Sequence, residues 1–154
     1  SQRVIDRSDS IAALVIASQA AENAGIQQDA HIKFTLPTDA QAETVVRTNL
    51  RSATRALTLL LDNARKFTKE GEVRLAIQKQ PATIDFIVED TGIGVPAQEA
   101  EHIFDEFVQL DEYYDGTGIG LTVARSIARR LGGDIRLDTS YSGGARFVMS
   151  LPKE

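Results

Sequence analysis

The sequence predicts a two-layer α/β sandwich, an α+β fold in which a mixed, mostly antiparallel sheet carries helices on one face. Two kinds of segment lead to this prediction. Some have apolar residues at the three- and four-residue steps of an amphipathic helix, and others are short, β-rich and bounded by glycine or proline. With 154 residues, the chain is long enough to bury a sizeable core, so we expect residues 1–154 to form a single domain.

The first elements expected are a helix and a short strand. The helix covers residues 8 to about 24, with Ser8 or Asp9 as its N-cap and Gly25 at its end. The strand lies in "HIKFTLP", residues 31–37, where apolar residues alternate before a proline ends the segment.

A long helix and two strands are expected next. The helix runs from about residue 39 to 68, and one apolar stripe defines its buried side. The members of this stripe are Val46, Leu50, Ala53, Leu57, Leu60 and Ala64. The strands "EVRLAIQKQ" and "ATIDFIVED" follow, and the second is largely apolar, which indicates either burial on both sides or a central place in the sheet.

The last third of the chain is expected to hold a short helix near 98–104, a helix from about 117 to 131, and a final hairpin. "LGG" ends the second helix. The hairpin strands "GDIRLDTS" and "ARFVMSLP" are joined by the turn "YSGG".

Composition narrows the class of protein. The net charge of −5 disfavours nucleic-acid binding, which usually goes with a basic excess. There is no cysteine, which excludes disulfides and cysteine-bound metals and is compatible with a reducing compartment. No signal peptide or apolar run of membrane-spanning length is visible. We expect a cytoplasmic domain cut from a longer protein, whose full length can include a membrane anchor.

The end of the long helix carries the first candidate site, in "LDNARKFTKEG". Asn63 and Lys66 share one helix face. The Asn63 carbonyl oxygen suits Mg²⁺, which prefers oxygen ligands, and Lys66 can place a positive charge on phosphates. Alternatively, Asn63 satisfies backbone groups and Lys66 complements the helix dipole, and on this segment alone that alternative is favoured.

The second candidate site lies in the segment "FIVEDTGIGVP", residues 86–96. Asp90 ends a buried strand and can accept a hydrogen bond from an exocyclic amine. Gly92 and Gly94 allow the backbone to approach a flat ring closely. A plain turn in which Asp90 caps backbone amides explains this segment equally well.

The third candidate site lies in the segment "DGTGIGL", residues 115–121. Gly116, Gly118 and Gly120 precede a helix, and consecutive backbone amides at that place can bind an anion. A P-loop lysine is absent, and Leu121 stands where a dinucleotide fingerprint needs its third glycine. Taken alone, the segment is better explained as a flexible hinge.

Together these segments resemble a known family. "NARKFT", "DTGIGV", "IFDEFVQLD" and "GTGIGL…LGG" are similar, in this order, to the four signature boxes of the catalytic ATP-binding domain of bacterial sensor histidine kinases, in the GHKL superfamily. That superfamily also holds type II topoisomerase subunits, a mismatch-repair protein and a heat-shock chaperone. The resemblance runs from about Asn49 to Pro152 and includes the closing "GGARFVMSLP".

The resemblance implies a role for each matched position. Asn63 would bind Mg²⁺, Lys66 would contact phosphate, and Asp90 would bind the adenine amino group of ATP. The remaining matched residues would line the base pocket, anchor a lid over residues 96–115, or wrap the phosphates. In that order they are Gly92, Ile93 and Gly94; Phe104 and Phe107; and Gly116, Thr117, Gly118, Ile119, Gly120 and Leu121.

Three features depart from the family pattern. Leu59 stands where relatives that hydrolyse ATP place a carboxylate, so hydrolysis by this domain alone should be slow. The expected lid is acidic and has neither lysine nor arginine, although relatives often use a basic residue there. Ala145 and Arg146 stand just before Phe147, where the family often has a threonine that reaches adenine through water, so recognition would depend more on Asp90.

The function implied is that of a histidine protein kinase, a phosphotransferase in two-component signal transduction. The γ-phosphoryl of ATP would pass to a histidine on a separate dimerisation domain of the same protein, and then to a response regulator. Neither His31 nor His102 has the sequence context of the acceptor. We expect a monomeric domain from a homodimeric protein. The alternatives are an adaptor module without turnover and an anti-sigma serine kinase.

Overall fold

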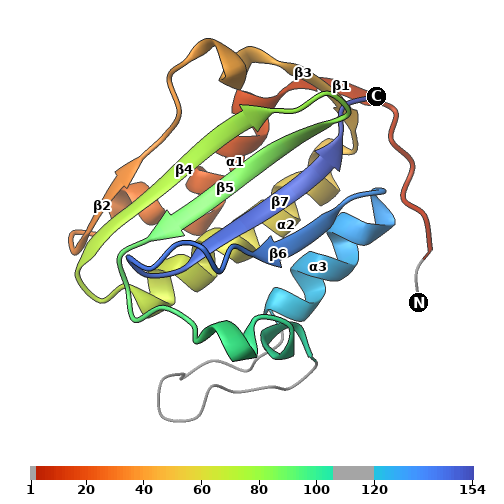
Figure 1. Cartoon of the computed structure of the whole chain (residues 1–154). Coiled ribbons are helices and arrows are strands. Elements are labelled where there is room, and N and C mark those ends of the chain that lie inside the picture. The colour runs from red at the N-terminus through yellow and green to blue at the C-terminus, as the bar shows by residue number, and fades with distance from the viewer. Residues whose placement is uncertain (1–2, 106–119) are drawn as a thin grey trace.

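Residues 3–105 and 120–154 are described by the computed structural model. Within these ranges, five strands form one sheet in the order β2-β4-β5-β7-β6, and helices cover one of its faces (Figure 1). β2 pairs with β4 in parallel, and every other neighbouring pair in this sheet is antiparallel. The predicted fold class is therefore confirmed. The strands are β2 (Ile32–Thr35), β4 (Gly71–Lys79), β5 (Thr83–Asp90), β6 (Asp134–Leu137) and β7 (Arg146–Pro152).

The central strand β5 shows how the two faces of the sheet differ. Successive side chains of a strand point to opposite faces. Ile84, Phe86 and Val88 belong to the apolar core under the helices. Asp90 has the same parity, so its side chain lies on the helix-covered side, whereas Glu89 faces the uncovered side. The prediction of a central, largely buried strand is confirmed.

Three helices in the described ranges complete the core. α1 (Ala13–Ala24) packs against α2 (Leu50–Phe67), which in turn packs against α3 (Gly120–Arg130). α1 ends at Gly25, whose φ of 66° is the left-handed conformation that glycine adopts easily, as predicted. None of these helices has the length and apolar composition needed to cross a lipid bilayer.

The helix expected from residue 8 begins later. Residues Asp9–Ala12 form a strand, β1, and neither Ser8 nor Asp9 caps α1. The Asp9 carboxylate instead accepts a hydrogen bond from the Leu50 amide, at 2.9 Å, at the start of α2. The prediction was wrong because β1 pairs with a strand far along the chain, which local periodicity does not reveal.

The long helix expected from residue 39 is also shorter than predicted. A 3₁₀ turn (Ala40–Glu43) and the strand β3 (Val45–Thr48) precede it, and β3 pairs antiparallel with β1. Asn49 then caps α2 by accepting a hydrogen bond from the Ser52 amide at 2.9 Å. Val46 is buried as expected, but it is buried from a strand.

The segment expected as a short helix near 98–104 consists of two 3₁₀ turns, Ala97–Glu99 and His102–Phe104. The final hairpin is confirmed, since β6 and β7 pair antiparallel. α3 begins at Gly120 in the described part of the chain, and its expected start at Thr117 lies outside that part.

Candidate nucleotide-binding site

The loop after β5 lies directly against the end of α2. The Ile93 amide donates a hydrogen bond to the Phe67 carbonyl at 3.2 Å. Gly92 is so close to the same carbonyl that a Cβ at this position would overlap it. Asn63 lies one helical turn before Phe67. The structure thus brings the first and second predicted segments together at one end of the sheet.

The Asp90 carboxylate is buried at this end. Only 2% of the residue is exposed. Its Oδ1 accepts hydrogen bonds from the Gly92 amide at 2.9 Å and the Ala145 amide at 3.0 Å. Among the described residues, Oδ2 has no hydrogen-bond partner. The two explanations offered for Asp90 are therefore compatible, because one oxygen caps amides and the other is left for a donor.

Burial raises the pKa of Asp90, and the hydrogen bonds from the Ala145 and Gly92 amides oppose this rise. A buried carboxylate with an unused oxygen is costly unless it gains a partner. An exocyclic amine would supply that partner through a hydrogen bond to a charged group.

Two glycines let the chain pass close to Asp90. Gly94 has a φ of 75°, which favours glycine. Gly144 is packed so tightly that a Cβ would overlap the Asp90 carbonyl oxygen and lie 2.8 Å from Oδ1. Ile93, between Gly92 and Gly94, is 54% exposed, so its side chain is not part of the core.

Asn63 and Lys66 face a less crowded environment. Asn63 is half-buried and Lys66 is exposed. Within the described ranges, the side-chain amide of Asn63 makes no hydrogen bond and the side-chain ammonium of Lys66 makes no ion pair. Lys66 and Arg65 lie in the last turn of α2, where they also complement the helix dipole.

The donor set suits a magnesium ion held jointly with phosphate. No group of three or more acidic or histidine side chains is placed to hold a metal in the described part of the chain. The Asn63 carbonyl oxygen is an available hard ligand, and Mg²⁺ commonly takes one or two protein oxygens together with water and phosphate. These residues therefore fit Mg²⁺ only in company with a nucleotide.

Phe104 joins this end of the sheet to α3. Its ring contacts the Phe147 ring edge-on, with centroids 6.1 Å apart. The Thr122 hydroxyl donates to the Phe104 carbonyl at 2.8 Å, and the Arg125 guanidinium lies 4.1 Å from the centre of the ring. Phe104 is thus part of the core, and its role as a lid anchor stays a prediction.

The remaining predicted residues divide into two groups. Gly120 begins α3, and Leu121 is buried in the core behind it. The others lie outside the described residues: Phe107, Gly116, Thr117, Gly118 and Ile119. Half of the expected lid, residues 106–115, lies outside them as well.

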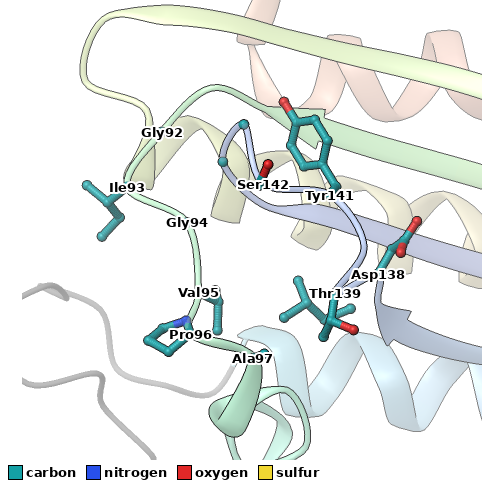
Figure 2. A pocket seen from close by; sticks show the side chains of 13 residues that line it. Gly92, Ile93, Gly94, Val95, Pro96, Ala97, Asp138, Thr139, Tyr141 and Ser142 are labelled. Carbon is teal, nitrogen blue, oxygen red and sulfur yellow. The ribbon is translucent and has the colours of Figure 1, made fainter.

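A cavity of about 500 Å³ opens between the loop after β5 and the turn that joins β6 to β7 (Figure 2). One wall is formed by Gly92 to Ala97, and the other by residues of the turn, including Asp138, Tyr141 and Gly144. Sequence reasoning did not single out Tyr141, whose hydroxyl donates to the Asp90 carbonyl at 3.1 Å. No local motif marks this residue, because only the strand pairing brings it to Asp90.

The chain is similar to known proteins. The family model of histidine kinase-, DNA gyrase B-, and HSP90-like ATPases matches residues 48–154. The sensor protein RstB of Escherichia coli K12 is 41% identical over 109 residues, which are 68% of this chain and 25% of RstB. The chain therefore spans about a quarter of the length of that relative.

Solved structures agree on the fold. The mycobacterial sensor histidine kinase MprB superposes with a TM-score of 0.80 at 23% identity, over 94% of this chain and 97% of that one. Full-length ShkA in complex with AMPPNP superposes with a TM-score of 0.79 at 24% identity, over 97% of this chain and 32% of ShkA. The chain belongs to the histidine kinase-, DNA gyrase B-, and HSP90-like ATPase family, and within it is a catalytic ATP-binding domain of the sensor histidine kinase type.

Proposed function

We propose that this domain binds ATP with Mg²⁺ and passes the γ-phosphoryl group to a histidine on a separate dimerisation domain of the same protein. The observation that carries the proposal is the buried Asp90 carboxylate, with one oxygen unused, beside the end of the helix that bears Asn63. ShkA, part of which shares this fold, was solved in complex with AMPPNP, and this supports a nucleotide as the ligand.

Each residue has a definite task in this proposal. Asp90 Oδ2 accepts a hydrogen bond from the adenine amino group, while Gly92 and Gly94 keep the backbone close to the base. Asn63 would hold Mg²⁺, which supplies charge neutralisation on the phosphates when bound. Lys66 adds a flexible positive charge on the same side of α2. Positioning and electrostatics therefore account for most of the expected catalysis.

The acceptor histidine is proposed to lie outside this domain. Its imidazole nitrogen would form a bond to the γ-phosphorus as the bond to the β–γ bridging oxygen breaks and ADP leaves, and a response regulator would then take the phosphoryl group. His31 and His102 lie on the exposed surface, near Glu70 and Asp105 respectively. Leu59 packs against the core and cannot accept a proton.

Calorimetric titration with ATP, with and without Mg²⁺, tests the proposal. We expect binding that Mg²⁺ strengthens, and we expect Asn63→Ala to remove most of that strengthening while weaker, metal-independent binding remains. Absence of binding at millimolar ATP would instead favour the adaptor module. Incubation with radiolabelled ATP should leave no acid-labile phosphate on the domain, whereas labelling of His31 or His102 would contradict a separate acceptor.

A further inference from the structure

The turn between β6 and β7 holds the end of β5 through several contacts. The Asp90 amide donates to the Ala145 carbonyl at 2.8 Å, and the Ala145 amide donates to Asp90 Oδ1 at 3.0 Å. The Tyr141 hydroxyl donates to the Asp90 carbonyl at 3.1 Å. The backbone of Asp90 and one of its carboxylate oxygens are therefore fixed by the same turn.

The Tyr141 ring is held in place by its neighbours. It covers Gly143, where a Cβ would lie 2.6 Å from the Tyr141 hydroxyl oxygen. The Arg146 guanidinium lies 4.3 Å from the centre of the ring. Tyr141 stands beside the cavity, at the side of the turn (Figure 2). A side chain at position 143 would displace the phenol, so the glycine and the tyrosine work together.

Arg146 is itself fixed by two carboxylates on the uncovered face of the sheet. It donates to Glu89 at 2.9 and 2.7 Å and to Asp138 at 3.2 Å. Asp138 also accepts two hydrogen bonds from Ser140, at 3.0 and 2.6 Å. Because Glu89 and Asp138 hold the Arg146 guanidinium over the ring, the phenol has little freedom to leave Asp90.

We propose that Tyr141 is a positioning residue that keeps the Asp90 carboxylate aimed at the amino group of the base, and so sets the preference for a 6-aminopurine. This inference rests on the proposed function. Tyr141 acts through Asp90 and does not itself touch the nucleotide. Without its hydroxyl, the Asp90 carbonyl loses a donor and the turn can shift, which loosens the Ala145 hydrogen bond to Oδ1. Burial and the charges of Glu89 and Asp90 raise the pKa of Tyr141, so the phenol stays a donor at neutral pH.

The test compares two nucleotides on the wild type and on Tyr141→Phe. ATP and purine riboside triphosphate, which has hydrogen in place of the 6-amino group, are titrated by calorimetry in the presence of Mg²⁺. A misaimed Oδ2 should lose about the worth of one neutral hydrogen bond to the adenine amino group, which would weaken ATP binding about three- to tenfold. Binding of the analogue should change little, so the ratio of the two affinities should fall by the same factor. This ratio does not depend on the folded fraction of the variant.

Thr58→Val is the matched control. It removes another hydroxyl that donates to a backbone carbonyl, that of Thr54 at 2.7 Å on α2, and should leave the affinity ratio unchanged. A wild-type preference for ATP that Tyr141→Phe retains overturns this inference alone. A wild type that binds neither nucleotide, or binds both equally, overturns the proposed recognition by Asp90 and this inference with it.

Discussion

Asp90 shows how a single residue can be unfavourable for stability and useful for binding. Burial of a carboxylate costs free energy, and the two amide hydrogen bonds at Oδ1 offset this cost only in part. The raised pKa of Asp90 reflects the remaining imbalance. A ligand that donates a hydrogen bond to Oδ2 would offset the remaining cost of burial. The cost of burying Asp90 in the free protein is therefore linked to the gain in free energy when the ligand binds.

Asp90→Asn should weaken ATP binding by about 1.5–3 kcal/mol, the usual worth of a hydrogen bond to a charged group. The asparagine oxygen can still accept the two amides, but its NH₂ group would then face the adenine amine, donor against donor. Calorimetric titration measures the change. Asp85→Asn is the control, because Asp85 is a buried carboxylate of the same strand that is bonded to Ser150 on the other face. Equal losses in the two variants would contradict base recognition by Asp90.

The raised pKa also predicts how stability depends on pH. Well below pH 3.8, the ordinary pKa of an aspartate, Asp90 is protonated in the folded and the unfolded protein and carries no penalty. As the pH rises, the unfolded chain ionises first, so the wild type loses stability relative to Asp90→Asn until the pH passes the raised pKa. Urea unfolding between pH 4 and 7 should show this difference falling and then levelling. A difference that grows with pH would show that the pKa is lowered instead.

Gly144→Ala should destabilise the protein and impair nucleotide binding together. Gly144 has a φ of 156°, and a Cβ would meet the Asp90 carbonyl oxygen, so about 1–3 kcal/mol of unfolding free energy should be lost. Gly25→Ala is the comparison: its φ of 66° also strains an alanine, but its Cβ would have only an ordinary contact, 3.6 Å from Arg65, so it should lower stability without impairing ATP binding. Thermal unfolding and ATP titration of both variants check this. Normal ATP binding by Gly144→Ala would mean that the turn does not support Asp90.

At the scale of elements, the sequence predicted the five strands of the sheet and the buried face of α2, because burial on one side leaves a local period. It did not predict β1 and β3. These strands have four residues each and gain their stability from pairing across the chain. Asp9 was read as a cap of the nearest helix, but it caps α2 instead.

The residues of the candidate site divide in the same way, into those that a local sequence pattern reveals and those that only tertiary pairing brings into place. Asp90, Gly92 and Gly94 were recognisable because they follow one another after a strand. Tyr141 was not, because its contact with Asp90 depends on the register in which Glu89 pairs with Arg146. Residues that touch a ligand leave motifs, whereas residues that hold them in place depend on tertiary pairing.

The contribution of one helix cap to stability can be tested at Asn49, the N-cap of α2. Asn49→Ala should lower the free energy of unfolding by about 1 kcal/mol, since the Ser52 amide loses its acceptor. Asn49→Ser keeps an acceptor oxygen and should recover most of the loss, although it also removes the bond to the Asp6 carbonyl. Chemical denaturation of the three proteins provides the measurement. If the serine variant were as unstable as the alanine variant, the bond to Asp6 would be the important one.

At the scale of the molecule, the residues matched by the family model are fewer than the residues that build the hydrophobic core. The matched region begins at residue 48, yet α1 contributes a buried apolar face to the core that α2 also lines. That face consists of Ala13, Ile16, Ala17, Ala20, Ala21 and Ala24. Its absence would leave the facing side of α2 open to water.

A fragment of residues 48–154 should therefore fail to unfold cooperatively, although residues 1–154 should show one transition. The reason is the loss of the α1 layer and of the β1–β3 pair, which removes apolar burial from a domain of ordinary, marginal stability. Circular dichroism during thermal unfolding distinguishes the two outcomes. A sharp transition in the shorter fragment would place the folding unit within the family match.

The segment before β1 starts beside the end of α3, where the Ile5 amide donates to the Arg130 carbonyl, and passes the C-terminal residue only at Arg7 (Figure 1). The Arg7 guanidinium donates to the Glu154 carbonyl at 2.9 Å, and the Arg47 guanidinium donates to the Arg7 carbonyl at 3.2 Å. The Arg47 amide also donates to the Lys153 carbonyl at 2.7 Å, so the segment before β1, the strand β3 and the residues after β7 hold one another. Removing the last two residues would therefore also release the Arg7 side chain from its carbonyl acceptor on Glu154.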